Sequence, residues 1–118
     1  MNSSGLVDSP GEADKTAKMT EADILRALAS DKRLLILHWL KSPRAHFPPQ
    51  VDGDLVNDGV CGILIAEKLA ISQSTLSEHM RVLVQIGLVV PKRVKQWVFY
   101  RRDEVRAKEI SAIIAARI

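Results

Sequence analysis

The chain has 118 residues, of which 47% are hydrophobic and 26% charged, and its net charge is +3. This length suits one domain with a modest core and is too short for two. No apolar run approaches the roughly 18 residues of a membrane span, and the start of the chain lacks the apolar segment of a signal peptide, so we expect a cytoplasmic protein without a membrane partner.

Basic residues are concentrated in the second half of the chain. Residues 72–106 carry 7 Lys and Arg against 3 Asp and Glu, whereas residues 1–71 carry 8 against 10. A local basic excess of this kind favours contact with phosphates. The single cysteine, Cys61, excludes an intramolecular disulfide and a zinc site built from clustered thiolates.

The first part of the chain predicts an arm and two helices. Residues 1–19 are rich in Ser, Gly, Asp and Lys without apolar periodicity, so we expect a disordered arm. Thr20 can cap a first helix. The apolar stripe of that helix consists of Ile24, Leu25 and Leu28. A second helix starts at Asp31 and is so apolar over residues 34–40 that neighbours should cover nearly its whole circumference, with His38 packed or at the boundary.

Residues 41–60 contain three prolines and two glycines and predict a long loop. Its acids Asp52, Asp54 and Asp58 lack the central glycine and the closing glutamate of a calcium-binding loop. We therefore expect a solvated connector, with neither a metal nor a cofactor.

Residues 63–87 predict two helices joined by a tight turn, which is the helix-turn-helix pattern. Ser72 is a good N-cap for the second helix, over residues 72–86, and Gly87 suits its end. One face of this helix is apolar and consists of Leu76, Met80, Leu83 and Val84. The opposite face is polar and consists of Ser74, Ser77, Glu78, Arg81 and Gln85. Short polar side chains at such a helix start suit phosphates and bases in a major groove, although a helical pair that only packs fits the pattern too.

Two β-branched and aromatic runs, residues 88–90 and 97–100, predict a two-stranded hairpin. Basic residues gather at and after its tip: Lys92, Arg93, Lys95, Arg101 and Arg102. Basic tips are also ordinary solvated turns, but a position directly after the recognition helix favours phosphate contact.

Asp103 can cap a last helix. Its apolar residues are Val105, Ala107, Ile110, Ile113, Ile114 and Ile118. These exceed what a small core can cover, so we expect a dimer seam with the first helix.

The predicted fold class is α+β, mostly α: a winged helix-turn-helix over residues 20–118 with about five helices and a two-stranded β-hairpin wing. This order of elements resembles the winged-helix repressors of the ArsR family, from about Ile24 to the last helix. The resemblance rests on LASDKRLLIL (28–37), IAEKL (65–69), SQSTLSEHMRVL (72–83), and GLV (87–89) leading to WVFY (97–100).

The resemblance implies a homodimeric repressor that binds a pseudo-palindromic operator in double-stranded DNA and releases it when an inducer binds. In the family pattern Gln73, Ser74, Thr75, Ser77 and His79 approach bases or phosphates. With the cap, the outer helix face and the wing, the expected DNA-contacting set is Ser72, Gln73, Ser74, Thr75, Ser77, His79, Arg81, Lys92, Arg93 and Lys95. Ser74, Ser77 and Arg81 come first, because His79 lies toward the core flank. Glu78 either accepts from a cytosine amino group or lies outside the contact.

Departures from the family concern the sensed signal. Its arsenic and cadmium sensors carry a Cys-x-Cys pair whose positions fall on Cys61 and Ile63, and one thiolate cannot chelate as two do. Residues 103–118 contain no histidine, so the family's Asp and His metal site on the last helix has no counterpart. Cys61 is either a redox-sensing thiol or a small buried filler. Ala70 stands where the family often has glycine, a strain of about 1 kcal/mol if this residue is left-handed.

The alternative to a DNA-binding regulator is a winged-helix protein-interaction module without sequence-specific DNA binding. Such a module has little need for a basic hairpin tip. We do not expect an enzyme, since His38, His46 and His79 have no Ser, Cys or carboxylate at a recognisable spacing and no phosphate-cradling glycine loop exists. The inducer and the operator stay undefined.

Overall fold

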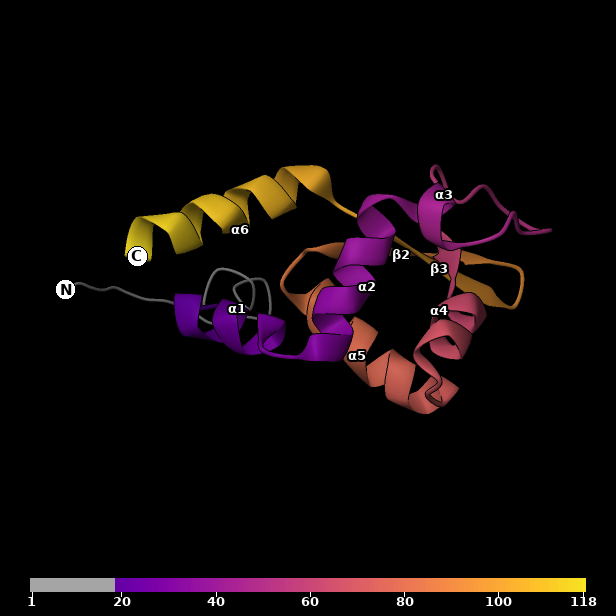
Figure 1. The fold of residues 1–118 in the computed structure, drawn as a ribbon, viewed down its shortest axis with the longest axis horizontal. Helices are drawn as coiled ribbons and strands as arrows, with labels where there is room; N and C mark the ends of the chain where they lie inside the picture. Colours follow the sequence, from indigo (N-terminus) through magenta and orange to yellow (C-terminus); the bar gives the residue numbers. More distant parts are fainter. Residues whose placement is uncertain (1–18) are drawn as a thin grey trace, which may run out of the picture.

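The computed structural model describes residues 19–118, so the arm expected at residues 1–19 lies outside them except for Met19. Figure 1 shows the order of the elements along the chain. They are α1 (Glu21–Leu28), α2 (Asp31–Lys41), α3 (Pro43–His46), β1 (Val60–Cys61), α4 (Gly62–Leu69), α5 (Gln73–Gln85), β2 (Val89–Val94), β3 (Trp97–Arg102) and α6 (Glu104–Arg117). The α+β, mostly helical class is confirmed.

The long helices start at side chains that cap them. The hydroxyl of Thr20 accepts from the amide of Asp23, and the Asp23 carboxylate accepts from the Thr20 amide in return. This capping box, with the nearby Arg26, lowers the pKa of Asp23 to about 2. Helices α5 and α6 start at the predicted caps Ser72 and Asp103, whose side chains accept from the amides of Thr75 and Arg106.

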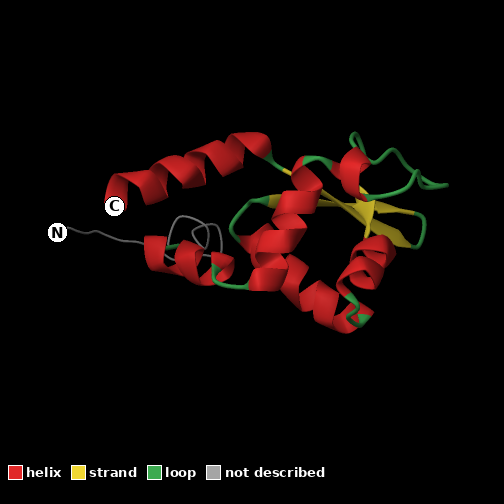
Figure 2. Ribbon diagram, in the orientation of Figure 1, coloured by secondary structure: helices red, strands yellow, loops and turns green. Residues whose placement is uncertain are grey.

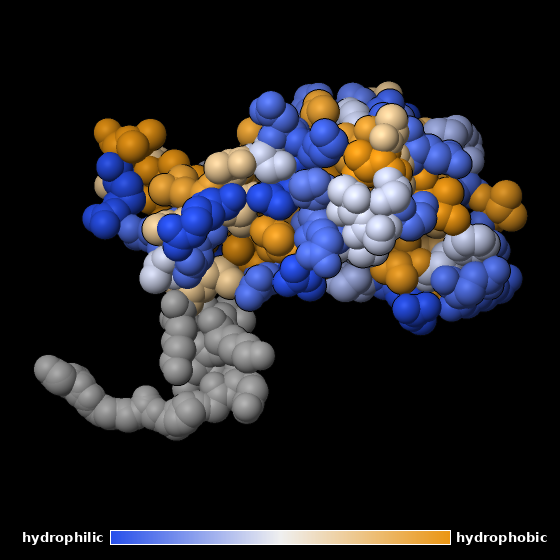
Figure 3. Space-filling view, turned by 90° about the horizontal axis from the view of Figure 1, so that it is seen from below, coloured by the Kyte–Doolittle hydropathy of each residue, from blue (hydrophilic) through white to orange (hydrophobic). Residues whose placement is uncertain are grey.

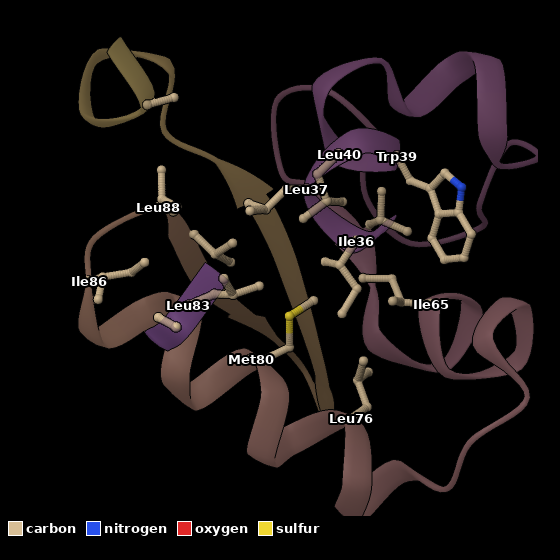
Figure 4. Packing of buried hydrophobic residues seen from close by; sticks show 14 of the residues in the cluster. Ile36, Leu37, Trp39, Leu40, Ile65, Leu76, Met80, Leu83, Ile86 and Leu88 are labelled. Carbon is tan, nitrogen blue, oxygen red and sulfur yellow. The ribbon is translucent and has the colours of Figure 1, made fainter. Parts of the chain in front are cut away.

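Helix α5 packs its apolar face against α2 at the centre of the fold. Leu76, Met80 and Leu83 are 2%, 1% and 0% exposed, and Figure 4 shows them pointing toward Ile36 of α2. Burying each such side chain contributes about 1.5–3 kcal/mol. Val84, expected on the same face, is only partly buried. The face opposite this core contact is left free for solvent or a partner.

The sheet has three strands in the order β1-β3-β2, rather than the two predicted (Figure 2). In the added strand Val60 pairs with Tyr100 and Cys61 with Phe99. Gly59 permits this pairing, because its φ is +106° and a Cβ there would lie 2.4 Å from the Tyr100 carbonyl oxygen. A strand of two residues is too short to show the alternation of apolar and polar side chains by which strands are predicted, so β1 was missed.

The segment between α2 and α4 is folded, so the expectation of a solvated connector was wrong. It begins with α3, which brings the helices of residues 19–118 to six instead of about five. Phe47 and Leu55 from this segment are buried in the core. The Asp54 carboxylate accepts from the amides of Val56 and Asn57, and these bonds lower its pKa.

Helix α2 is less covered than its composition predicted. His38 is exposed, contrary to expectation, and its ring lies 5.1 Å from that of His46. Leu34 and Leu35 also stay exposed within the single chain. The apolar run of α2 therefore exceeds what one copy of the fold can bury.

Helices α1 and α6 lie side by side at the end of the molecule away from the wing (Figure 1). Arg117 of α6 pairs with Glu21 of α1 at 2.6 Å. Leu25 and Ile118 stay exposed here, as does Val105 at the start of α6, and Figure 3 shows hydrophobic atoms at the end of α6. Over residues 19–118, no helix is long and apolar enough to cross a membrane.

Candidate nucleic-acid interface

The turn between α4 and α5 fixes the angle at which α5 leaves the core. Ala70 closes α4 in the left-handed conformation, with φ 58° and ψ 44°. Its amide donates to the Glu67 carbonyl, and the Ile71 amide donates to that of Ala66. This bonding is that of a left-handed helix end, and it confirms the helix-turn-helix predicted from residues 63–87.

Hydroxyl groups form a small cluster at the start of α5. The Thr75 amide donates to Ser72 Oγ at 3.1 Å. The same oxygen lies 2.9 Å from Thr75 Oγ1 and 3.2 Å from Ser74 Oγ. All three side chains are exposed. Ser72 and Thr75 thus stabilise the helix end, where the unpaired amides and the helix dipole favour a phosphate.

The outer face of α5 carries Gln73, Ser74, Ser77, Glu78 and Arg81, all exposed. Arg81 donates to Glu78 at 2.5 Å, and this bond lowers the pKa of the Glu78 carboxyl. Glu78 therefore holds the guanidinium along the helix surface when no ligand competes for it. An exposed pair of this kind is worth little and can be exchanged for a stronger partner.

His79 lies on the flank of α5, as the helical periodicity predicted, and not on its outer face. It is partly buried, and its Nδ1 lies 3.1 Å from Arg33 Nη1 on α2. Burial lowers the pKa of His79, and the charges of Arg33 and Lys32 add to the effect. The structure thus gives His79 a contact between helices, which the periodicity did not reveal.

The wing, defined as residues 89–102, presents its basic residues in two directions. Lys92 pairs with Asp58, and Lys95 with Asp52 at 3.4 Å, both acids of the segment before β1. Arg93 stands opposite Val98 in the ladder and is exposed. The predicted basic residues of the wing therefore differ in their surroundings, since Lys92 and Lys95 have carboxylate partners within the chain and Arg93 is exposed.

A hollow of about 250 Å³ separates the wing from α5. Gln73 and Ser77 line it from the helix, and Gln96 and Tyr100 line it from the wing. Gln96 was missing from the predicted site. Its amide can donate and accept, which suits base edges, and its place in the hairpin turn is the feature that sequence reasoning could have used.

Two arginines near the wing serve the fold. Arg102 was predicted to follow the basic tip toward phosphates, but it donates to the Leu37 carbonyl at 3.2 Å and pairs with Glu104. Arg106 donates to the Ile86 carbonyl at 2.9 Å. Both side chains are partly buried and attach β3 and α6 to the core, so Arg102 is not part of the candidate surface.

Cys61 is partly buried at the junction of β1 and α4. Within residues 19–118, no three His, Cys, Asp or Glu side chains lie close enough together to hold a metal ion. The thiol borders two hollows, one beside α5 and one beneath the segment 49–52.

Comparison with known proteins decides the family. The sequence model of the bacterial regulatory protein, arsR family, matches residues 61–90, which span α4, the turn and α5. The uncharacterized HTH-type transcriptional regulator YbzH of Bacillus subtilis is 34% identical over 100 residues, which are 85% of this chain and all of that protein. The chain belongs to the ArsR family. It is a DNA-binding transcriptional regulator, a class that does not catalyse reactions.

Two further relatives of this ArsR-family regulator are informative. A putative arsenical resistance operon repressor, ArsR2 of Halobacterium salinarum, is 26% identical over 80% of this chain and 69% of its own length. A solution structure from Mycobacterium bovis, described as a homodimeric winged helix-turn-helix DNA-binding domain, covers 94% of this chain and 90% of its own. Its TM-score is 0.57 at 20% identity, so it supports the winged helix-turn-helix fold alone.

Proposed function

We propose that this ArsR-family regulator is a homodimeric repressor that reads a pseudo-palindromic operator with α5 and the wing. One observation carries the proposal: the outer face of α5 is polar and exposed along its length, and it lies beside a basic hairpin. In helix-turn-helix proteins such a face enters the major groove while neighbouring cations contact the backbone.

The residues divide by role in this proposal. The side chains that project from the exposed face of α5 read base edges or adjoining phosphates. They are Gln73, Ser74, Ser77 and Arg81. Ser72 and Thr75 hold the helix start against a phosphate. Arg93, Lys92 and Lys95 contact the backbone from the wing, the two lysines after exchanging their carboxylate partners for phosphates. His79 contributes through the orientation of α5.

The proposed dimer uses the α1 and α6 end of the molecule. Leu25 of α1 and Val105 and Ile118 of α6 are exposed in the single chain, and an apolar surface of this kind favours burial against a second copy. The Mycobacterium bovis domain of the same fold is described as homodimeric. Two copies related by a twofold axis present two recognition helices, which suits a pseudo-palindrome.

Repression is the direction we propose, since the relative from Halobacterium salinarum is described as a repressor. A protein that occupies an operator represses by excluding other proteins, and an inducer would release it. The proposal places the protein in the cytoplasm with the chromosome.

Binding of the full chain to random and genomic double-stranded DNA at several salt concentrations tests this function. We expect sequence-selective binding. The logarithm of the association constant should fall linearly with the logarithm of the salt concentration. Selected sequences should contain two related half-sites about one helical turn apart. Binding without selectivity by a folded dimer would instead indicate a protein-interaction module.

A further inference from the structure

A pocket of about 300 Å³ lies between the segment 49–52, the start of α4 and β3. Phe99 and Trp97 line it from β3, and Ile63 and Leu64 line it from α4. It adjoins the hollow beside α5 and shares Cys61, Ile63 and Trp97 with it, whereas Phe99 and the segment 49–52 line this pocket and not the hollow. Gln73 and Ser77, which we propose to contact DNA, line the hollow and not this pocket.

Hydrogen bonds hold the wall of the pocket in place. The Gln50 amide group donates to the Gly59 carbonyl at 2.7 Å and accepts from the Cys61 amide at 3.0 Å. Gly53, with φ +99°, lies so close to Phe99 that a Cβ would come within 2.9 Å of the ring. Contacts within the chain thus fix the wall of the pocket, as is usual for small-molecule sites.

The lining of the pocket is apolar and gives no counter-charge for an anion. No lysine, arginine or histidine of residues 19–118 lines it. The carboxylate of Asp52 lines it but has Lys95 as its partner. Val51 at its mouth is 100% exposed, a hydrophobic side chain that the fold itself leaves uncovered. A ligand that covered Val51 and stacked on Trp97 would remove apolar surface from water.

We propose that this pocket binds uncharged aromatic molecules of one or two rings. Its volume is at the lower end of the range of small-molecule sites, which is about 300–1,000 Å³. The class follows from the lining, because aromatic rings pack against Trp97 and the aliphatic wall, whereas a negative charge would be desolvated without a partner. Binding here does not depend on DNA recognition.

Titration of the full chain with indole and with 2-naphthol, followed by NMR, tests the proposal, with 2-naphthoate as the anionic control. The indole N–H resonance of Trp97, assigned from its absence in Trp97→Phe, should shift saturably with both neutral probes and not with the anion. The resonance of Trp39, which is 9% exposed in the core, is the internal control.

Two variants test whether the probes bind in this pocket. Ile63→Asp puts a charge into the pocket at the first turn of α4, where the helix dipole favours an acid, and should weaken binding about tenfold or more. Val51→Ser, at a fully exposed position that cannot disturb folding, should weaken it about threefold. Val56→Ser, at an exposed position that does not line the pocket, is the matched control and should leave probe binding unchanged. No saturable shift at Trp97, or a shift unchanged in Val51→Ser, would overturn the proposal, because Val51 lines this pocket and not the hollow beside α5. Either result counts whether or not the protein binds DNA selectively.

Discussion

The guanidinium of Arg33 lies 3.1 Å from Nδ1 of His79 and joins α2 to α5 across 46 residues of sequence. Arginine can only donate, so Nδ1 must accept and the imidazole must be neutral, with its proton on Nε2. Burial lowers the pKa of His79, and the nearby charges of Arg33 and Lys32 lower it further. The orientation of the recognition helix thus depends in part on an uncharged histidine.

This contact predicts a pH dependence of stability. The folded pKa of His79 lies below its ordinary value of 6.5, so the unfolded chain binds more protons as the pH falls through 6.5. Neutral His79 contributes its full stabilisation above pH 6.5. This contribution is lost as the pH falls from 6.5 through the lower pKa that His79 has in the folded protein. Urea unfolding should show that wild type loses more free energy of unfolding than His79→Gln from about pH 7.5 to about pH 5.5. An equal loss in both proteins would contradict this account, because they differ only at residue 79.

Ala70 predicts a stabilising substitution. Its φ of 58° is left-handed, which costs an alanine about 1 kcal/mol and costs glycine little. Ala70→Gly should raise the free energy of unfolding by up to ~1 kcal/mol, offset in part by the greater freedom of glycine in the unfolded chain. Ala22→Gly, at an exposed position of α1, is the control and should lower stability by roughly 0.5–1 kcal/mol. A loss of stability in Ala70→Gly would show that the turn is unstrained.

The pairing of Lys92 with Asp58 predicts an effect on DNA affinity. The Lys92 ammonium lowers the pKa of the Asp58 carboxyl, so this acid stays charged and competes with phosphate for the lysine. Asp58→Asn should tighten DNA binding roughly threefold or more at low salt, because it frees Lys92 and removes a negative charge from the wing. Its remaining amide oxygen can still accept from the Asp54 amide, so the segment should stay folded. Glu109→Gln on α6 makes the same charge change elsewhere, and an equal gain in that variant would refute the local explanation.

The exposed apolar side of α6 predicts the position of the dimer interface. Val105 is 71% exposed in the single chain. Val105→Lys should raise the monomer–dimer dissociation constant about tenfold or more in sedimentation experiments, since a lysine would have to be desolvated in the interface. Val51→Lys, the same change at the pocket mouth, should leave the constant unchanged. The dimer would use another surface if the two variants behaved alike.

Long periodic elements were predictable from the sequence and short ones were not. The apolar spacing of Leu76, Met80 and Leu83, with Ser72 before it and Gly87 after it, defines α5 to within one residue at each end. In contrast, β1 and α3 are too short to show a period, and both depend on contacts with distant residues. The partner of β1, for instance, is β3, about 40 residues further along the chain.

The exposed face of α5 was predictable from the sequence, but the contacts that the candidate residues make within the chain were not. Helical periodicity correctly predicted that His79 lies outside the exposed face of α5. It could not show that Lys92 and Lys95 have acidic partners, because Asp58 and Asp52 come from a segment whose course depends on Gln50 and Gly53. Arg102 looked like a further phosphate contact, and only the position of the Leu37 carbonyl shows that it attaches the wing to the core.

Two arginine variants show whether the outer face of α5 reads a DNA sequence. Arg81 on α5 pairs with Glu78, and Arg26 on α1 pairs with Asp23, each three residues away and each exposed. Selection of binding sites from random double-stranded DNA would be measured for Arg81→Ala, Arg26→Ala and wild type. We predict that Arg81→Ala loses about 1–3 kcal/mol of discrimination at defined base positions, while Arg26→Ala selects the wild-type sequence. Unchanged selectivity in Arg81→Ala, or an equal loss in both variants, would contradict the account.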